Sequence, residues 1–160
     1  MSNTRTVVAL AGAMSFAALS GAFAEDKTPE QMGADVFNKR CKTCHIVEDT
    51  ATKSKKAGPN LIDVYGRTAG ARELYTKFGK SIKAAGAAGL VWNTEELGAY
   101  LKDPRKYLRA KLDDKKAKSR MAYKLRKEKD RINVIAYLKS LNPPKEGGDA
   151  ATTEDSTATN

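Results

Sequence analysis

The sequence predicts an all-α fold of short helices and long loops, and two observations support this prediction. Apolar residues recur at helical spacing in several stretches, whereas no stretch alternates apolar and polar residues as a half-buried strand would. Glycine and proline occur in a long segment without sustained period, which indicates an ordered loop. With 160 residues, the chain has room for one ordinary domain.

Both ends of the chain are expected to lie outside that domain. Residues 1–24 contain one cation, an uncharged run and an Ala-x-Ala site, which is the pattern of a secretory signal peptide cleaved after Ala24. A membrane-anchoring helix is the alternative, although the uncharged run is shorter than the roughly 20 residues that a span needs. Residues 146–160 hold four acids and no base, and they predict a disordered acidic tail. The folded domain is therefore expected over residues 25–145.

The first helix is predicted to begin at Thr28, where a hydroxyl N-cap, a proline and Gln31 have the pattern of a capping box. The positions that then fall on one face at helical spacing are Gly33, Phe37, Cys41 and Cys44. The following stretch, residues 46–70, has no sustained period and is interpreted as the ordered loop.

Further short helices are predicted in the second half of the chain. One ends at the glycines at 86 and 89, and the next follows Trp92 and stops at Pro104, which opens another short turn of helix. The last helix runs from about Glu128 to Leu141. The residues expected on its inward face are Val134, Ile135, Leu138 and Leu141.

The segment Cys41-Lys42-Thr43-Cys44-His45 has the C-x-x-C-H spacing of c-type haem attachment. Near the end of a helix, cysteines three residues apart lie on one face, so both sulfurs can add to the two vinyl groups of one porphyrin. His45 would then be held over the iron, and because it is the only histidine in the chain, a multi-histidine zinc site is excluded. The alternatives are a disulfide or a thioredoxin-like motif, but the latter needs a βαβ unit that the sequence does not show.

A single histidine leaves the sixth iron position to be filled, and the chain has four methionines. Met1 and Met14 would leave with the signal peptide, and Met32 lies on the cysteine-bearing helix, too close to reach the opposite face of the ring. Met121 lies far along the chain in a segment without helical period, from which a loop could reach the iron. Core packing is the alternative role for a lone methionine. As a ligand, Met121 would raise the reduction potential.

A longer series of residues occurs in order around these positions. Its members are Gly33, Phe37, Gly58-Pro59-Asn60-Leu61, Tyr65-Gly66-Arg67, Trp92, Tyr100-Leu101, Pro104 and Ala136-Tyr137-Leu138. Together with the cysteine motif and Met121, this series over residues 30–142 resembles a class I cytochrome c of the bacterial c2 type. The resemblance implies a helical shell around one covalently bound haem c with one exposed edge. It also implies that the first and last helices cross at Gly33 and Tyr137.

The resemblance implies roles for four residues around the haem. The carbonyl of Pro59 would accept the second ring N–H of His45 and so orient the ring. Arg67 and Trp92 would hold a buried propionate, and Tyr100 would lie beside the methionine sulfur. The alternatives are aromatic core for Trp92 and Tyr100 and an ordinary surface position for Arg67.

The chain also departs from the family's pattern. Where related bacterial proteins carry a tyrosine that bonds a propionate, this chain has Phe78, and Tyr75 one turn earlier is not assigned that role. The segments 46–57 and 110–118 are longer than in the mitochondrial relatives, so only a surface position is expected for them.

Positive charge is concentrated in one segment of a chain whose formal net charge is +10. Residues 111–129 hold nine cations against three acids. A solvated surface is the ordinary interpretation of such a run, but together these charges could steer the protein toward an acidic docking surface. Export and a haem site argue against nucleic acid as the partner.

These observations predict a soluble periplasmic one-electron carrier that is monomeric and not an enzyme. By the resemblance, the donor would be a membrane quinol–cytochrome c oxidoreductase, and the acceptor would be a terminal oxidase or a photosynthetic reaction centre. The alternative is a haem enzyme or gas sensor, which needs the vacant sixth position that Met121 would close.

Overall fold

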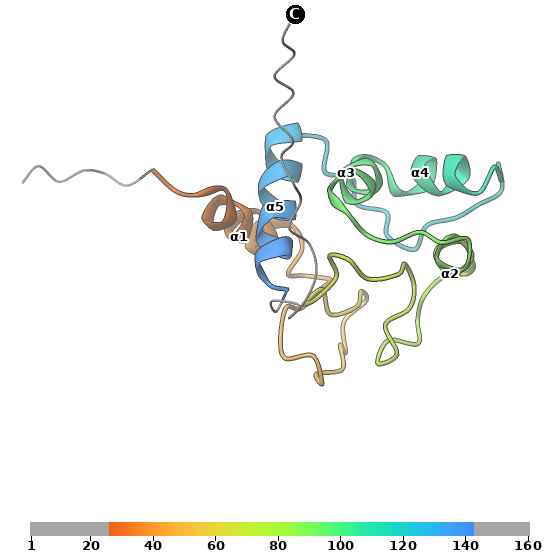
Figure 1. Cartoon of the computed structure of the whole chain (residues 1–160), viewed down its shortest axis with the longest axis horizontal. Helices are drawn as coiled ribbons and strands as arrows, with labels where there is room; N and C mark the ends of the chain where they lie inside the picture. Colours follow the sequence, from red (N-terminus) through yellow and green to blue (C-terminus); the bar gives the residue numbers. More distant parts are fainter. Residues whose placement is uncertain (1–25, 143–160) are drawn as a thin grey trace, which may run out of the picture.

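A computed structural model describes residues 26–142, so the predicted signal peptide and acidic tail lie outside the described residues. Within this range the chain forms helices and loops and no sheet, which confirms the all-α prediction (Figure 1). The helices are α1 (Pro29–Arg40), α2 (Lys80–Ala87), α3 (Thr94–Lys102), α4 (Pro104–Lys111) and α5 (Glu128–Ser140). Two isolated bridges, Ile46 to Asn60 and Thr68 to Val91, join loop segments. None of the helices in residues 26–142 is long and apolar enough to cross a membrane.

Helix α1 begins as predicted but ends earlier than the cysteine spacing indicates. The Thr28 side chain accepts the N–H of Gln31 at 3.3 Å, and the Gln31 side chain accepts the N–H of Thr28 at 2.9 Å. At the C-terminal end of α1, the N–H of Cys41 donates to the carbonyl of Phe37 at 2.8 Å. The N–H groups of Cys44 and His45 then both bond the carbonyl of Cys41, at 3.0 and 2.9 Å, so the motif forms a separate turn after the helix.

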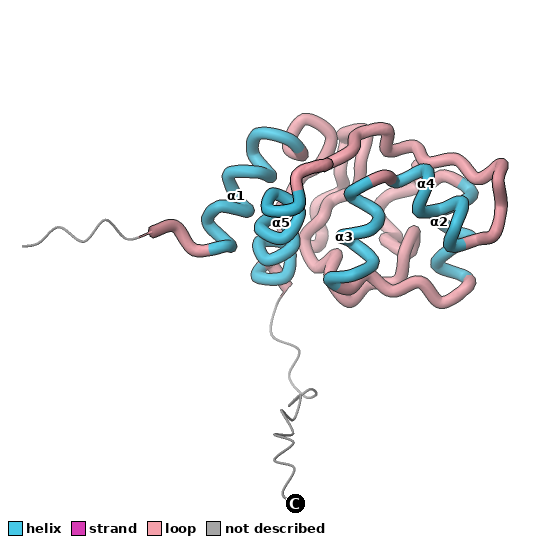
Figure 2. Tube along the Cα trace, turned by 90° about the horizontal axis from the view of Figure 1, so that it is seen from above, coloured by secondary structure: helices cyan, strands magenta, loops and turns pink. Residues whose placement is uncertain are grey.

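Helices α1 and α5 cross in contact at one end of the domain, and α2, α3 and α4 gather at the other (Figure 2). The crossing depends on Gly33, because a Cβ at this position would lie 2.0 Å from the carbonyl oxygen of Asn133. The rings of Phe37 and Tyr137 meet beside it with their centroids 5.7 Å apart. The predicted crossing of the first and last helices at Gly33 and Tyr137 is therefore confirmed.

Side-chain caps set the start of the two helices in the middle of the chain. Asn93 accepts the N–H of Glu96 at 2.8 Å at the start of α3, and Asp103 accepts the N–H of Lys106 at 3.0 Å at the start of α4. The long loop after α4 returns to the core where the N–H of Leu125 bonds the carbonyl of Leu101 at 2.8 Å. This bond holds residues 112–127 against α3, which places Met121 over the core.

Candidate haem site

A cavity of about 390 Å³ lies between the helices and the loops. All eight residues that the sequence assigns to a haem line this cavity: Cys41, Cys44, His45, Pro59, Arg67, Trp92, Tyr100 and Met121. The rest of the wall is largely apolar and includes Leu61, Val64, Leu97, Leu101 and Leu108. The structure thus brings together residues from both halves of the chain around one apolar space.

His45 is held with one ring nitrogen occupied and the other free to bind a metal. Its Nδ1 donates to the carbonyl of Pro59 at 2.9 Å, which leaves the lone pair on Nε2. Burial lowers the pKa of His45, and this outweighs the bond to Pro59, which acts in the opposite direction. The ring is therefore neutral at neutral pH, the form that binds iron.

Gly58 makes room for this ring. A Cβ at Gly58 would lie 2.3 Å from Cε1 of His45, and the N–H of Gly58 bonds the carbonyl of Cys44 at 2.8 Å. The sequence shows this glycine in the Gly-Pro-Asn segment, but its contact with the histidine ring becomes visible only in the folded chain.

The two cysteines are free thiols and do not form a disulfide. Burial, with a smaller effect of Cys44, raises the pKa of Cys41 to about 11, so this thiol is protonated at neutral pH. Both sulfur-bearing residues lie at the same cavity as His45. They are therefore available for thioether bonds to one porphyrin.

The two methionines in residues 26–142 lie in different environments. Met121 lines the cavity, whereas Met32 lies at the helix crossing, where its Sδ accepts a hydrogen bond from Nδ2 of Asn133 at 3.8 Å. Ser119 holds the loop at Met121, because its Oγ accepts the N–H of Met121 at 3.1 Å and donates to its carbonyl at 2.9 Å. The Tyr100 hydroxyl lies 3.3 Å from the same Oγ.

Ser119 is the site residue that sequence reasoning missed. A hydroxyl two residues before Met121 is a recognisable turn signal, but its link to Tyr100 depends on tertiary structure.

Trp92 and Arg67 lie side by side on the cavity wall. The backbone N–H of Trp92 bonds the carbonyl of Arg67 at 3.0 Å, and the indole packs on the Tyr100 ring with centroids 5.1 Å apart. The guanidinium of Arg67 is half-buried and donates to the carbonyl of Ile62 at 3.1 Å. Arg67 is therefore not an ordinary surface arginine, and the two aromatic residues both pack in the core and face the cavity.

Tyr75 and Phe78 both line the cavity. They lie where related bacterial proteins carry the propionate-bonding tyrosine, and neither was assigned that role from the sequence. The Tyr75 hydroxyl donates to the carbonyl of Ala57, and its ring meets Phe78 edge-on at 4.9 Å. The hydroxyl thus has a backbone partner on the loop that precedes Gly58.

The family model for cytochrome c matches residues 30–142, which contain all of the cavity residues named above. The chain belongs to the class I cytochromes c, of the c2 type. It is 45% identical to cytochrome c2 of Cereibacter sphaeroides over 140 residues, which covers 84% of this chain and 94% of that protein. It is 46% identical to cytochrome c-551 of Roseobacter denitrificans over 143 residues, or 87% of this chain and 96% of that protein.

Solved structures give the same result. The crystal structure of cytochrome c2 from Rhodobacter sphaeroides matches with a TM-score of 0.66 and 43% identity, over 74% of this chain and 100% of that chain. Cytochrome c2 from Rhodospirillum centenum matches with a TM-score of 0.65 and 36% identity, over 73% of this chain and 100% of that chain. The fold of this cytochrome is therefore the class I fold.

This cytochrome carries one covalently bound haem c with its iron, attached through Cys41 and Cys44. The residues present fit that group: two free thiols three residues apart, an imidazole with Nε2 available, a glycine that clears the ring, and apolar walls. Within residues 26–142 there is no cluster of three or more His, Cys, Asp or Glu that could hold a separate metal ion.

Proposed function

We propose that this cytochrome is a soluble periplasmic one-electron carrier whose haem iron is ligated by His45 and Met121. The observation that carries the proposal is that both residues line one cavity, while Met32 lies at the α1–α5 crossing. Bound there, the haem supplies a one-electron redox couple, and a Met/His ligand pair raises its potential. Export to the periplasm is inferred from the signal pattern of residues 1–24.

The protein's own residues would hold the haem in one geometry, so that little rearrangement accompanies electron transfer. Pro59 fixes the plane of the His45 ring, and Ser119 fixes the backbone of Met121. Arg67 and Trp92 would offset the cost of burying a propionate, and Tyr100 would lie beside the methionine sulfur. The apolar walls would keep water away from the bound haem.

A haem enzyme or gas sensor is the second candidate, and it needs a vacant sixth position. The loop at Met121 argues against this candidate, because it is tied to α3 on both sides of Met121. The Ser119 hydroxyl lies 3.3 Å from that of Tyr100, and the N–H of Leu125 bonds the carbonyl of Leu101 at 2.8 Å. Electron transport is also the role that the c2-type family indicates.

Several positive side chains are part of the cavity wall and would favour an acidic partner. Besides Arg67, four cations line the cavity, namely Arg40, Lys77, Lys118 and Arg120. Lys111 and Lys124, in the same basic segment, are paired instead with Glu96 and Asp103, so their charge is largely balanced. The proposed partners of the monomer are a membrane quinol–cytochrome c oxidoreductase as donor and a terminal oxidase or photosynthetic reaction centre as acceptor.

Reversal of Lys115, Lys118 and Arg120 to glutamate tests this docking surface. We expect the second-order rate of electron transfer with a purified quinol–cytochrome c oxidoreductase to fall more than about tenfold at low salt, because long-range attraction is lost. The visible spectrum should stay the same. Stopped-flow rates measured from low to high salt give the result, and the wild-type rate should fall steeply as salt screens the charges.

The matched control reverses three exposed cations outside the basic segment, Lys27, Lys102 and Lys139. Lys102 and Lys139 line a separate groove between α3 and α5, away from the cavity. This variant carries the same change in net charge, so a general charge effect would slow it equally. Equal slowing of the two triple variants, or wild-type rates that ignore salt, would show that the basic segment is only a solvated surface.

A further inference from the structure

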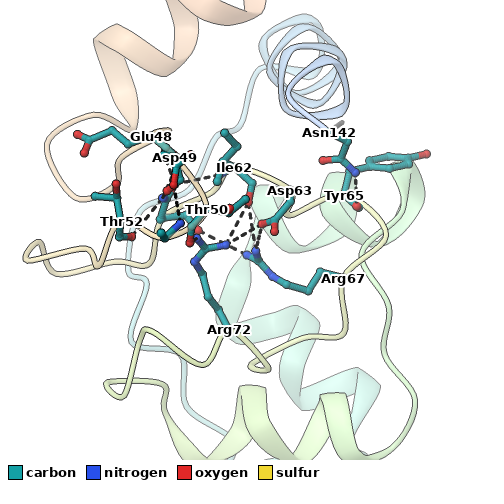
Figure 3. A network of polar contacts seen from close by, with 12 residues as sticks. Glu48, Asp49, Thr50, Thr52, Ile62, Asp63, Tyr65, Arg67, Arg72 and Asn142 are labelled. Atoms are coloured by element: carbon teal, nitrogen blue, oxygen red, sulfur yellow. Dashed lines mark hydrogen bonds and ion pairs between the residues drawn. The ribbon is translucent and has the colours of Figure 1, made fainter. Parts of the chain in front are cut away.

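Two arginines converge on one carboxylate beside the haem cavity (Figure 3). Oδ1 of Asp63 accepts hydrogen bonds from Nη1 of Arg67 and from Nη1 of Arg72, the latter at 2.7 Å. Arg72 also donates to the carbonyl of Thr50 at 2.8 Å, which ties the 48–52 loop to this cluster. We call Arg67, Asp63 and Arg72 the arginine–aspartate cluster.

The cluster holds more positive than negative charge in a largely buried part of the protein. Arg72 is only 8% exposed, and the side chains of Arg67 and Asp63 are 18% and 34% exposed. Two guanidinium charges face one carboxylate charge, so one positive charge is left without a partner in the cluster. In addition, Nε of Arg72 is buried and has no hydrogen-bond partner within the described residues. Such groups cost free energy, so stability alone does not explain them.

Asp63 is kept at a backbone position that favours glycine. Its φ is 57°, in the left-handed region, where side chains other than Asn and Asp are strained. From this position the carboxylate reaches both arginines. The conformation therefore places a negative charge between two cations, where a glycine would leave Arg67 and Arg72 sharing only the carbonyl of Ile62.

Only one member of the cluster reaches the haem cavity. Arg67 is part of the cavity lining, whereas Asp63 and Arg72 are not. Arg72 can therefore act on the haem only through Asp63 and through its own electric field. Because Arg72 also binds the Asp63 carboxylate, that carboxylate neutralises the charge of Arg67 only in part. The remaining positive charge of Arg67 then acts on the cavity.

We propose that Arg72 is a positioning residue that keeps the arginine–aspartate cluster at one net positive charge and thereby raises the reduction potential of the haem. This proposal rests on the haem site proposed above. Reduction adds an electron at the haem, and a nearby positive charge in a poorly solvated region stabilises the reduced form. The potential should therefore follow the net charge of the cluster.

Redox titration of four holoproteins tests this proposal: wild type, Arg72→Met, Asp63→Asn and the double variant. Arg72→Met takes the cluster from one positive charge to none, and we expect the equilibrium constant for reduction to fall roughly three- to tenfold. Asp63→Asn takes the cluster to two positive charges and should raise the equilibrium constant for reduction by a similar factor. Asparagine also tolerates the left-handed backbone at this position. The double variant restores one positive charge and should return near the wild-type value.

Two controls separate charge from loosening of the loop. Arg72→Lys keeps the charge but loses the forked hydrogen bonds to Asp63 and Thr50, so its potential should stay near wild type even if its melting temperature falls. Lys53→Gln removes one exposed charge with no partner in the cluster and should change the potential little.

The proposal is overturned if Arg72→Met and Asp63→Asn shift the potential in the same direction, since that is the signature of a disturbed fold. It is also overturned if neither variant shifts it while both remain folded. The wild-type spectrum separates these outcomes from a failure of the haem site itself, which would appear as the absence of the sulfur–iron band before any variant is made.

Discussion

Met121→Ala is expected to change the properties of the iron more than any other single substitution in this cytochrome. Loss of the thioether opens the sixth position, so the sulfur–iron absorption band of the oxidised protein should vanish and small ligands such as azide or imidazole should bind. The reduction potential should fall by more than about 59 mV, a tenfold change in the one-electron equilibrium constant. Visible spectra, ligand titration and potentiometry measure these effects.

Met32→Ala is the matched control, because Met32 packs at the α1–α5 crossing and not in the cavity. Met32 is half-buried, so the truncation should lower the free energy of unfolding by about 1 kcal/mol, while the band and the potential stay unchanged. If the band survives in Met121→Ala, or disappears in Met32→Ala, the proposed ligand is wrong.

Gly33→Ala is expected to have the largest effect on folding. Helix propensity alone predicts that alanine inside α1 stabilises the protein by roughly 0.5 to 1 kcal/mol. The structure predicts the opposite, because the new Cβ would lie 2.0 Å from the carbonyl oxygen of Asn133 and 2.7 Å from Cβ of Tyr137. The two helices must move apart, and we expect a loss of about 3 kcal/mol in the free energy of unfolding by denaturant.

Gly98→Ala provides the comparison, because Gly98 also lies inside a helix. The nearest atom to its added Cβ is Cδ1 of Ile135 at 3.9 Å, which is an ordinary contact. This variant should gain the stability that propensity predicts. If both alanine variants gain stability, the close crossing of α1 and α5 is not present in solution.

Local features were predictable from the sequence because they depend on few neighbours. The capping box at Thr28, the proline that opens α4 and the C-x-x-C-H motif act over three to five residues, and the structure has the first two where the spacing indicates. The choice of Met121 needed only the methionine count and the position of the cysteines. All eight predicted site residues lie on one cavity, although their roles toward the haem remain predictions.

Several features that depend on tertiary contacts were not predictable. Helical spacing could not show that α1 ends at Arg40, because the end is set by two N–H groups that share the Phe37 carbonyl. Asp63 and Arg72 are nine residues apart in a loop without period, and no pattern indicates that they pair. The bond between Tyr100 and Ser119 likewise requires the loop to return to α3.

A redox-titrated visible spectrum of the purified mature holoprotein is the most direct test of the proposed carrier. We expect a single one-electron step, a sulfur–iron band in the oxidised form, and no binding of carbon monoxide to the reduced form, because His45 and Met121 fill both axial positions. An oxidised spectrum without the sulfur–iron band, together with ready binding of carbon monoxide, would contradict a closed electron carrier and favour the open site of a haem enzyme or gas sensor.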